Sequence, residues 1–199
     1  RDRLAKGEVT VEQLMNDNSH EAIAMAEEYL KALKPNIAGW EADFGKEMMT
    51  KGKAWINFTW SGDAVWAIEE AEAVGVELDY VVPMEGSNVW FDGWVIPKYA
   101  QNIKAASYFI NFMCRPDIAL RNMDAIGYVS AVATPEILKA KIDPEIEEFY
   151  DLSYFFGEEA DSIHIDPVQY PDRKVIERCA VIRDFTNKED LEKALEMWS

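Results

Sequence analysis

Short apolar runs that end at turn or helix-start residues alternate along the chain with segments of helical periodicity. The run 53–60 is rich in aromatic and β-branched residues and stops at Ser61 and Gly62, which predicts a strand leading into a helix with Ser61 as its N-cap. Two further runs, 78–82 and 89–96, each end before a proline and also predict strands. Strands that alternate with helices predict an α/β architecture, in which ligands gather at strand ends and in the loops that follow.

Helical segments separate these runs. Ser19 can cap a helix through about residue 34, because apolar residues recur on one face and Pro35 follows its end. Gly127 follows another predicted helix and lets the chain turn to position Tyr128. Further helices are expected over about 102–115, 117–126 and 188–198, and the cap-then-proline pairs Thr134–Pro135 and Asp143–Pro144 predict two more helix starts.

Acidic residues outnumber basic ones, with 37 Asp and Glu against 20 Lys and Arg and a formal net charge of −17. Nucleic acid is therefore excluded as a partner, because phosphate binding requires a concentrated basic surface. The charge favours cationic ligands, although an acidic surface is more commonly only a solubility feature. A length of 199 residues, 49% of them hydrophobic, suffices for the core of one or two domains. No apolar run approaches the roughly 20 residues that a membrane-spanning helix needs.

Aromatic faces stand beside a carboxylate at two predicted strand ends. Trp60 closes the first run, and Trp90 and Asp92 lie two positions apart in the third. An ammonium group over an aromatic ring gains about 0.5–2 kcal/mol, and a buried charge must be paired. Tryptophan on a strand is more commonly a core residue. Asp92, however, interrupts an apolar run, and it is either an edge residue in water or a ligand-binding group; we favour the second interpretation.

Five short segments follow one another along the chain in a characteristic order. They are Trp-Ser-Gly-Asp-Ala from Trp60, Val-Val-Pro-Met-Glu-Gly from Val81, Trp-Phe-Asp-Gly-Trp-Val-Ile-Pro from Trp90, Ala-Ser-Tyr-Phe-Ile-Asn-Phe-Met-Cys-Arg-Pro-Asp from Ala106, and Ile-Gly-Tyr from Ile126. In this order they resemble the spermidine/putrescine substrate-binding proteins of ABC transporters, and the resemblance spans roughly residues 35–185. It implies a periplasmic-binding-protein-like fold of type II, whose two lobes close on a linear polyamine and deliver it to a membrane permease.

The resemblance assigns ligand-binding roles to particular positions and implies no cofactor. Ile182 stands where the family has a glutamine that hydrogen-bonds the ligand, and because an isoleucine side chain forms no hydrogen bond, the choice among polyamines stays open. The implied ligand-binding residues are the wall tryptophans Trp60 and Trp90, the amine-binding carboxylate Asp92, the cleft tyrosine Tyr128 and, in a preceding loop, Asp43.

The resemblance also implies that the chain is the C-terminal portion of a longer protein. Residues 1–92 and 166–199 are expected to form the C-terminal ligand-binding lobe, and 93–165 to contribute to the other lobe. Apolar residues such as Ile103 and Ile110 would then lack partners, so we expect a rearranged compact fold, self-association or a partner fragment. A signal or lipid anchor upstream would place the protein in the periplasm or at the outer face of the cytoplasmic membrane.

Two other function classes remain open. Carboxylates flanked by tryptophans also suit a glycoside hydrolase, which would require a second acid opposite Asp92. An acidic interaction module would instead expose Trp40, Trp94 or Trp198 in a patch. His164 and Asp166 alternate and could act together, but the chain has only two histidines and no cysteine cluster, so no metal site is expected. No nucleophile elbow, phosphate loop or dinucleotide fingerprint occurs, and catalysis is not expected.

Overall fold

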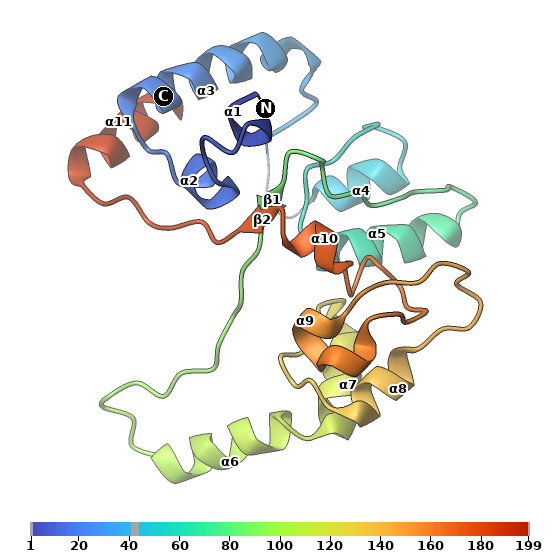
Figure 1. Cartoon of the computed structure of the whole chain (residues 1–199). Coiled ribbons are helices and arrows are strands. Elements are labelled where there is room, and N and C mark those ends of the chain that lie inside the picture. The colour runs from blue at the N-terminus through green and yellow to red at the C-terminus, as the bar shows by residue number, and fades with distance from the viewer. Residues whose placement is uncertain (1, 41–43, 199) are drawn as a thin grey trace. The chain divides into compact units, whose positions relative to one another are not determined.

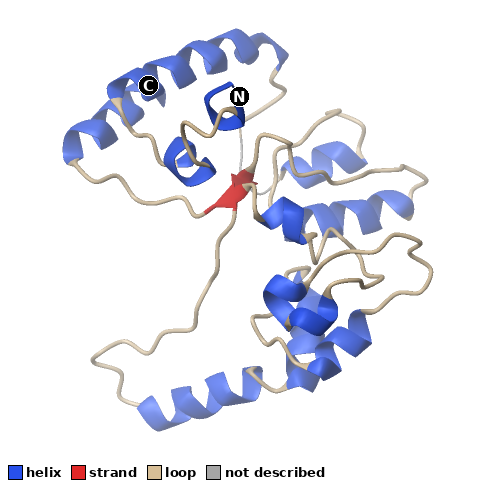
Figure 2. Ribbon diagram, viewed as in Figure 1, coloured by secondary structure: helices blue, strands red, loops and turns tan. Residues whose placement is uncertain are grey.

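The structure, a computed structural model, describes residues 2–40 and 44–198, and helices joined by long loops make up nearly all of this part of the chain (Figures 1 and 2). Its strands are β1 (Ser87–Asn88) and β2 (Cys179–Ala180), which pair in parallel with Ser87 opposite Cys179. The helices are α1 (Asp2–Ala5), α2 (Val11–Met15), α3 (His20–Leu33), η1 (Lys34–Asn36), α4 (Gly45–Thr50), α5 (Ser61–Glu72), α6 (Ile103–Met113), α7 (Pro116–Ile126), α8 (Pro135–Lys141), α9 (Ser153–Phe156), η2 (Glu158–Ala160), α10 (Arg173–Ile176) and α11 (Lys188–Trp198).

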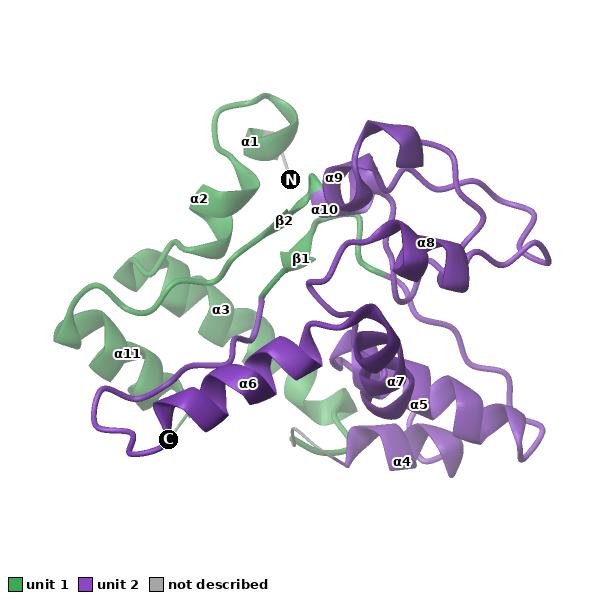
Figure 3. Cartoon of the chain, turned by 90° about the horizontal axis from the view of Figure 1, so that it is seen from below, with its two compact units in different colours: residues 1–42, 82–90, 177–199 green, residues 43–81, 91–176 purple. Residues whose placement is uncertain are grey.

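The chain divides into two compact units that are interleaved in sequence (Figure 3). Unit 1 comprises residues 1–42, 82–90 and 177–199, and unit 2 comprises residues 43–81 and 91–176. The chain therefore passes from one unit to the other directly after Trp90.

Unit 1 is held together by side-chain bonds to backbone groups around the β1–β2 pair. The side-chain amide of Asn16 donates to the carbonyl of Val181 at 3.0 Å and accepts from the backbone N–H of Arg183 at 2.6 Å. The Arg178 guanidinium donates to the carbonyls of Val82 and Pro83 at 3.0 and 3.1 Å. These bonds satisfy backbone groups that a pair of two-residue strands leaves open.

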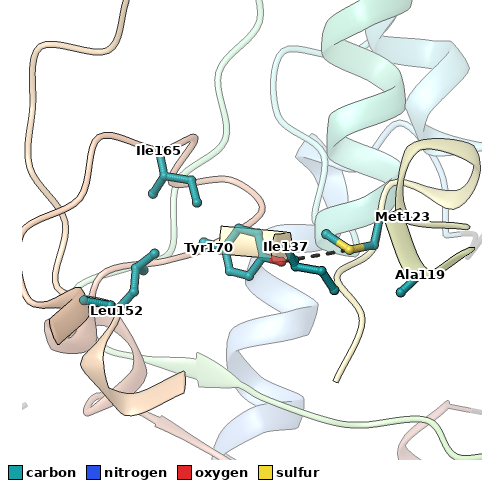
Figure 4. Packing of buried hydrophobic residues seen from close by; sticks show 7 residues of the cluster. Ala119, Met123, Ile137, Leu152, Ile165 and Tyr170 are labelled. Carbon is teal, nitrogen blue, oxygen red and sulfur yellow. Dashed lines mark hydrogen bonds between the residues drawn. The ribbon is translucent and has the colours of Figure 1, made fainter. Parts of the chain in front are cut away.

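The apolar core of unit 2 lies between α7, α8 and the loops that follow them. Tyr170 is almost fully buried, and its hydroxyl donates to the Met123 sulfur at 3.9 Å (Figure 4). Near this core, the Arg173 guanidinium bonds to Asp151 at 3.0 Å and also to the Ser153 hydroxyl. The buried cluster consists of Ala119, Met123, Ile137, Leu152, Ala160, Ile165 and Tyr170.

Most of the predicted helices form close to the expected bounds. The Ser19 hydroxyl accepts from the backbone N–H of Ala22 at 3.2 Å and caps α3, and Gly127 ends α7 with a φ of 74°. Two details of the prediction are wrong. Trp60, not Ser61, is the N-cap of α5, and the segment after Asp143 forms a turn, in which the Asp143 carboxylate accepts from the backbone N–H of Glu145 at 2.9 Å. An Asx turn of this kind offers the backbone an alternative to a helix.

The predicted strands 53–60, 78–82 and 89–96 are wrong for this structure, because no residue of these runs is part of a strand. The sheet expected of an α/β fold is reduced, in the described residues, to the β1–β2 pair. Trp55 and Phe58 are 97% and 94% exposed. A strand is stabilised by hydrogen bonds and side-chain pairs with its neighbours, and in residues 2–40 and 44–198 these segments do not pair with another strand. The apolar residues of these runs therefore form exposed surface that further strands or other apolar segments would have to cover.

Helix α6 shows the same property. No residue of α6 is buried, and Ile103 is 54% exposed. Trp94 packs edge-to-face on Phe109 with ring centroids 5.2 Å apart, so part of its apolar face is covered from within unit 2. None of the helices in the described residues is long and apolar enough to span a membrane.

Candidate functional site

The N-terminus of α5 is the centre of the candidate site. Trp60 is extended, with φ −73° and ψ 149°, and its carbonyl accepts from the backbone N–H of Ala64 at 3.0 Å. Gly62 and Ala64 are buried behind it. The Trp60 side chain is 46% exposed, so the helix start fixes the backbone of this residue while leaving the indole partly accessible.

Tyr128 lies directly against the first turn of α5. A Cβ added at Gly62 would overlap the Tyr128 ring, and a Cβ added at Gly127 would lie 2.8 Å from the carbonyl oxygen of Gly62. Gly127 also has a φ of 74°, a backbone angle that residues with a Cβ rarely adopt. The two glycines therefore permit the close approach that seats the tyrosine ring on the helix start.

Burial and nearby charges shift the pKa of Tyr128. The pKa of Tyr128 is raised, first by burial, next by the carboxylate of Asp63 and, more weakly, by Asp92 and Tyr80, while a hydrogen bond from the backbone of Asp63 acts in the opposite direction. Two carboxylates thus act on one hydroxyl, one from the helix and one from the extended segment after Trp90. Trp60, Asp63, Asp92 and Tyr128, all in unit 2, are called the acidic–aromatic cluster below.

Asp63 was not among the residues singled out from the sequence. Its carboxylate accepts from the Lys46 ammonium of α4 at 2.6 Å, and the two side chains are 21% and 28% exposed. An acid in the first turn of a helix has a common structural explanation, since it interacts favourably with the helix dipole. The sequence signal that could have identified Asp63 is its position three residues after Trp60.

A pocket of about 430 Å³ adjoins this helix start within unit 2. Its lining includes Lys46, Gly62, Asp63, Gly127 and Gln169. The Lys46 ammonium also lies 5.4 Å from the centroid of the Trp66 ring, so one side of the pocket carries a cation held between a carboxylate and an indole face.

The remaining residues to which the resemblance assigns a role, or a departure from the family, differ in position and exposure. Trp90 is half-buried in unit 1, just after β1, and the backbone N–H of its neighbour Val89 donates to the carbonyl of Ala180 at 3.0 Å. Ile182 also belongs to unit 1 and is exposed. Asp43 lies outside the described residues. Asp92 is exposed, so both interpretations of this residue remain compatible with its burial.

The features considered for other function classes have local structural roles. The His164 ring lies against Phe149, with centroids 3.9 Å apart, and Asp166 accepts from the backbone N–H of Val168 at 2.9 Å. No group of three or more His, Cys, Asp and Glu in residues 2–40 and 44–198 is arranged to hold a metal ion.

The tryptophans expected of an interaction module do not form one patch within a unit. Trp40 and Trp198 are exposed and pack edge-to-face in unit 1, with ring centroids 5.4 Å apart. Trp94 belongs to unit 2, where it packs on Phe109. Each of these exposed indoles therefore already contacts an aromatic or indole ring of its own unit.

Comparison with known proteins identifies relatives over most of the chain. The chain is 33% identical over 132 residues to the spermidine/putrescine-binding periplasmic protein of Salmonella typhimurium, an alignment that covers 66% of this chain and 36% of the relative. It is 30% identical over 114 residues to a putrescine-binding periplasmic protein of Escherichia coli, covering 55% of this chain and 31% of the relative. A putrescine/cadaverine-binding protein of Pseudomonas aeruginosa is 28% identical over 158 residues, covering 77% of this chain and 42% of the relative.

The chain thus spans about a third of the length of these relatives, and 36% of the first. A family profile of bacterial extracellular solute-binding proteins matches residues 5–147, a range that contains all four residues of the acidic–aromatic cluster. Because this match covers most of the chain, it indicates a periplasmic-binding-protein-like fold. The chain is a member of the bacterial extracellular solute-binding protein family.

Proposed function

We propose that the complete protein is an extracytoplasmic solute-binding protein that captures a polyamine, such as spermidine or putrescine, and delivers it to the permease of an ABC transporter. The observation that carries this proposal is the acidic–aromatic cluster, in which the Tyr128 ring lies against Gly62 at the start of α5 beside Trp60 and Asp63. The names of the relatives, which bind spermidine, putrescine or cadaverine, support the same ligand class.

The chemistry of the cluster suits a protonated polyamine. Such a ligand carries ammonium groups on an alkyl chain, so it requires carboxylates for its charges and apolar walls for its methylenes. Asp92 would pair with one ammonium, while the partly exposed indole of Trp60 would lie along the chain or beneath a cation. The Tyr128 hydroxyl would supply a further hydrogen bond.

Ligand capture would require the rest of the binding protein. In the complete molecule we propose a type II fold in which residues 1–92 and 166–199 form the C-terminal lobe and residues 93–165 contribute to the other lobe. In that arrangement Trp60, Trp90 and Asp92 would belong to the C-terminal lobe, Tyr128 would come from the segment 93–165, and Asp43 would add a polar contact. Closure is favoured by ligand because only the closed form makes both sets of contacts.

The proposed location is the periplasm or the outer face of the cytoplasmic membrane, with a lipid anchor as one means of attachment. The relatives named above as periplasmic support the first of these. We propose no catalytic role, since all three of these relatives are named as binding proteins. The glycoside hydrolase and interaction-module alternatives receive no support from these comparisons.

Calorimetric titration of spermidine and putrescine tests the proposal. The full-length protein and the 199-residue chain are titrated in parallel, with the dianion succinate as a control ligand of opposite charge. Binding of either polyamine, but not succinate, by the full-length protein supports the proposal, and binding by the shorter chain as well would show that these 199 residues already hold enough of the site. Absence of polyamine binding by the full-length protein would overturn it.

A further inference from the structure

Lys46 places a cation of the protein's own beside the proposed ligand site. Its ammonium lies 2.6 Å from the Asp63 carboxylate and 5.4 Å from the centroid of the Trp66 ring. A carboxylate on one side and an indole face on another are the surroundings that a ligand ammonium would seek. The Lys46 ammonium therefore has the same kind of surroundings, a carboxylate and an indole face, that we propose for an ammonium group of the ligand.

The position of this ion pair links it to the acidic–aromatic cluster. Lys46 lies in α4 and Asp63 in the first turn of α5, and both line the pocket of about 430 Å³ beside the helix start. Asp63 is also the charged group that most strongly raises the pKa of Tyr128. Lys46 thus pairs with a carboxylate that acts on the hydroxyl proposed to contact the ligand.

The partial burial of the pair strengthens its influence. With side chains 28% and 21% exposed, Lys46 and Asp63 are less screened than an ion pair in open solvent. A tethered ammonium also competes at a high effective concentration with any free amine. A ligand ammonium that approached Asp63 would have to displace Lys46, and an ammonium that stopped short of it would be repelled by the lysine charge.

We propose that Lys46 is a specificity-determining residue that lowers the affinity of the site for ligands of higher positive charge. The inference rests on the proposed polyamine-binding function. Lys46 neutralises Asp63, so within the acidic–aromatic cluster Asp92 is the carboxylate left for the ligand, and an additional ammonium placed beside Asp63 meets the charge of Lys46. The site then discriminates between a diamine and a triamine by charge number as well as by length.

The test is the ratio of spermidine to putrescine affinity in the full-length protein, measured by calorimetry in wild type and Lys46→Met. Removal of one unit charge near the site should raise the affinity for both ligands, more for the trication, so that the ratio increases by about fivefold. Lys46→Arg keeps the charge and should keep the wild-type ratio within about twofold, as expected if charge sets the selectivity.

Lys51→Met is the matched control, because it removes the same charge at the end of the same helix. Lys51 pairs with Glu47 at 2.7 Å and both side chains are largely exposed, so the ratio should stay within about twofold of wild type. Thermal melting accompanies each titration. If Lys46→Met melts well below wild type, Lys46→Gln provides the comparison, since its amide can still donate to Asp63.

The outcomes separate the inference from the function on which it rests. A wild-type ratio in a folded Lys46→Met or Lys46→Gln protein that binds both polyamines would overturn the role of Lys46 and leave the proposed function standing. An equal rise in Lys51→Met would also overturn it, since the effect would then be one of net charge. A wild-type protein that binds neither polyamine would overturn both.

Discussion

Gly62→Ala is the substitution for which the structure makes the sharpest prediction. In an isolated helix this change is favourable, because alanine has the higher helix propensity, by at most about 1 kcal/mol. In this protein the added methyl would overlap the Tyr128 ring. We therefore expect the tyrosine ring to leave its place against α5, with loss of stability and of the contact between Tyr128 and the start of this helix.

The size of the stability change follows from a comparison of Gly62→Ala in the wild-type protein and in a Tyr128→Ala protein. Insertion of a methyl group into a packed contact costs about 1–3 kcal/mol, whereas in a Tyr128→Ala background the ring is gone and only the helix-propensity gain remains. Gly62→Ala should thus destabilise the wild-type protein by up to about 2 kcal/mol, after subtraction of that gain, and stabilise the Tyr128→Ala protein slightly. The coupling between the two positions is then about 1–3 kcal/mol.

Urea denaturation of the wild type, the two single variants and the double variant measures this coupling. Gly39→Ala is a suitable control, because a Cβ at Gly39 would meet no atom within 4 Å and no coupling with Tyr128 is expected. A coupling below about 0.5 kcal/mol, the error of additivity for independent sites, would refute the placement of Tyr128 on the start of α5.

Three further predictions concern single side chains. Asp92→Asn should weaken polyamine binding by at least about 1.5 kcal/mol, the lower end for a charge-assisted hydrogen bond, and unchanged calorimetric affinity in the full-length protein would remove Asp92 from the site. Asp63→Asn should lower the pKa of Tyr128, whose rise owes more to Asp63 than to any other charge; ultraviolet titration with a Tyr128→Phe reference checks this, and an unchanged pKa contradicts it. Iodoacetamide should modify Cys114 before Cys179 in the folded protein, because Cys114 is exposed while burial raises the pKa of Cys179; peptide mapping that found Cys179 modified first would contradict the order.

The helices are predictable from the sequence because their signals are local. Ser19 caps α3 and Gly127 ends α7, as the positions of these residues along the chain predict. The failed helix start at Asp143 shows the limit of such signals, since the same aspartate can accept a bond within a turn instead. A local pattern predicts an element only where no competing local bond is stronger.

The strands are not predictable in the same way, because a strand is completed by residues far away in sequence. The runs around Trp55, Val81 and Val95 carry the residues that strands favour, yet their side chains are exposed in this structure. The β1–β2 pair forms instead where the carbonyl of Ala180 meets the backbone N–H of Val89. The sequence pattern therefore predicts which segments require partners, and the available partners decide which segments pair.

In the candidate site, too, local features can be predicted from the sequence and contacts between distant residues cannot. The placement of Tyr128 by Gly127 follows from the sequence, and the structure adds that Gly62 receives the ring. The pairing of Asp63 with Lys46 spans 17 residues and two helices, and no periodic pattern marks it. The ligand-binding roles of Trp60, Trp90, Asp92, Tyr128 and Asp43 stay predictions.

The start of a helix is an unfavourable place for a cation, since unsatisfied N–H groups give it a partial positive charge. A cation site there needs carboxylates that outweigh this charge, and Asp63, within the helix, already faces Lys46 at 2.6 Å. Asp92 reaches the cluster from outside the helix and is among the charges that act on Tyr128. For this reason the balance of charge at the α5 start depends chiefly on Asp92, and a polyamine would bind there through a residue that no part of α5 supplies.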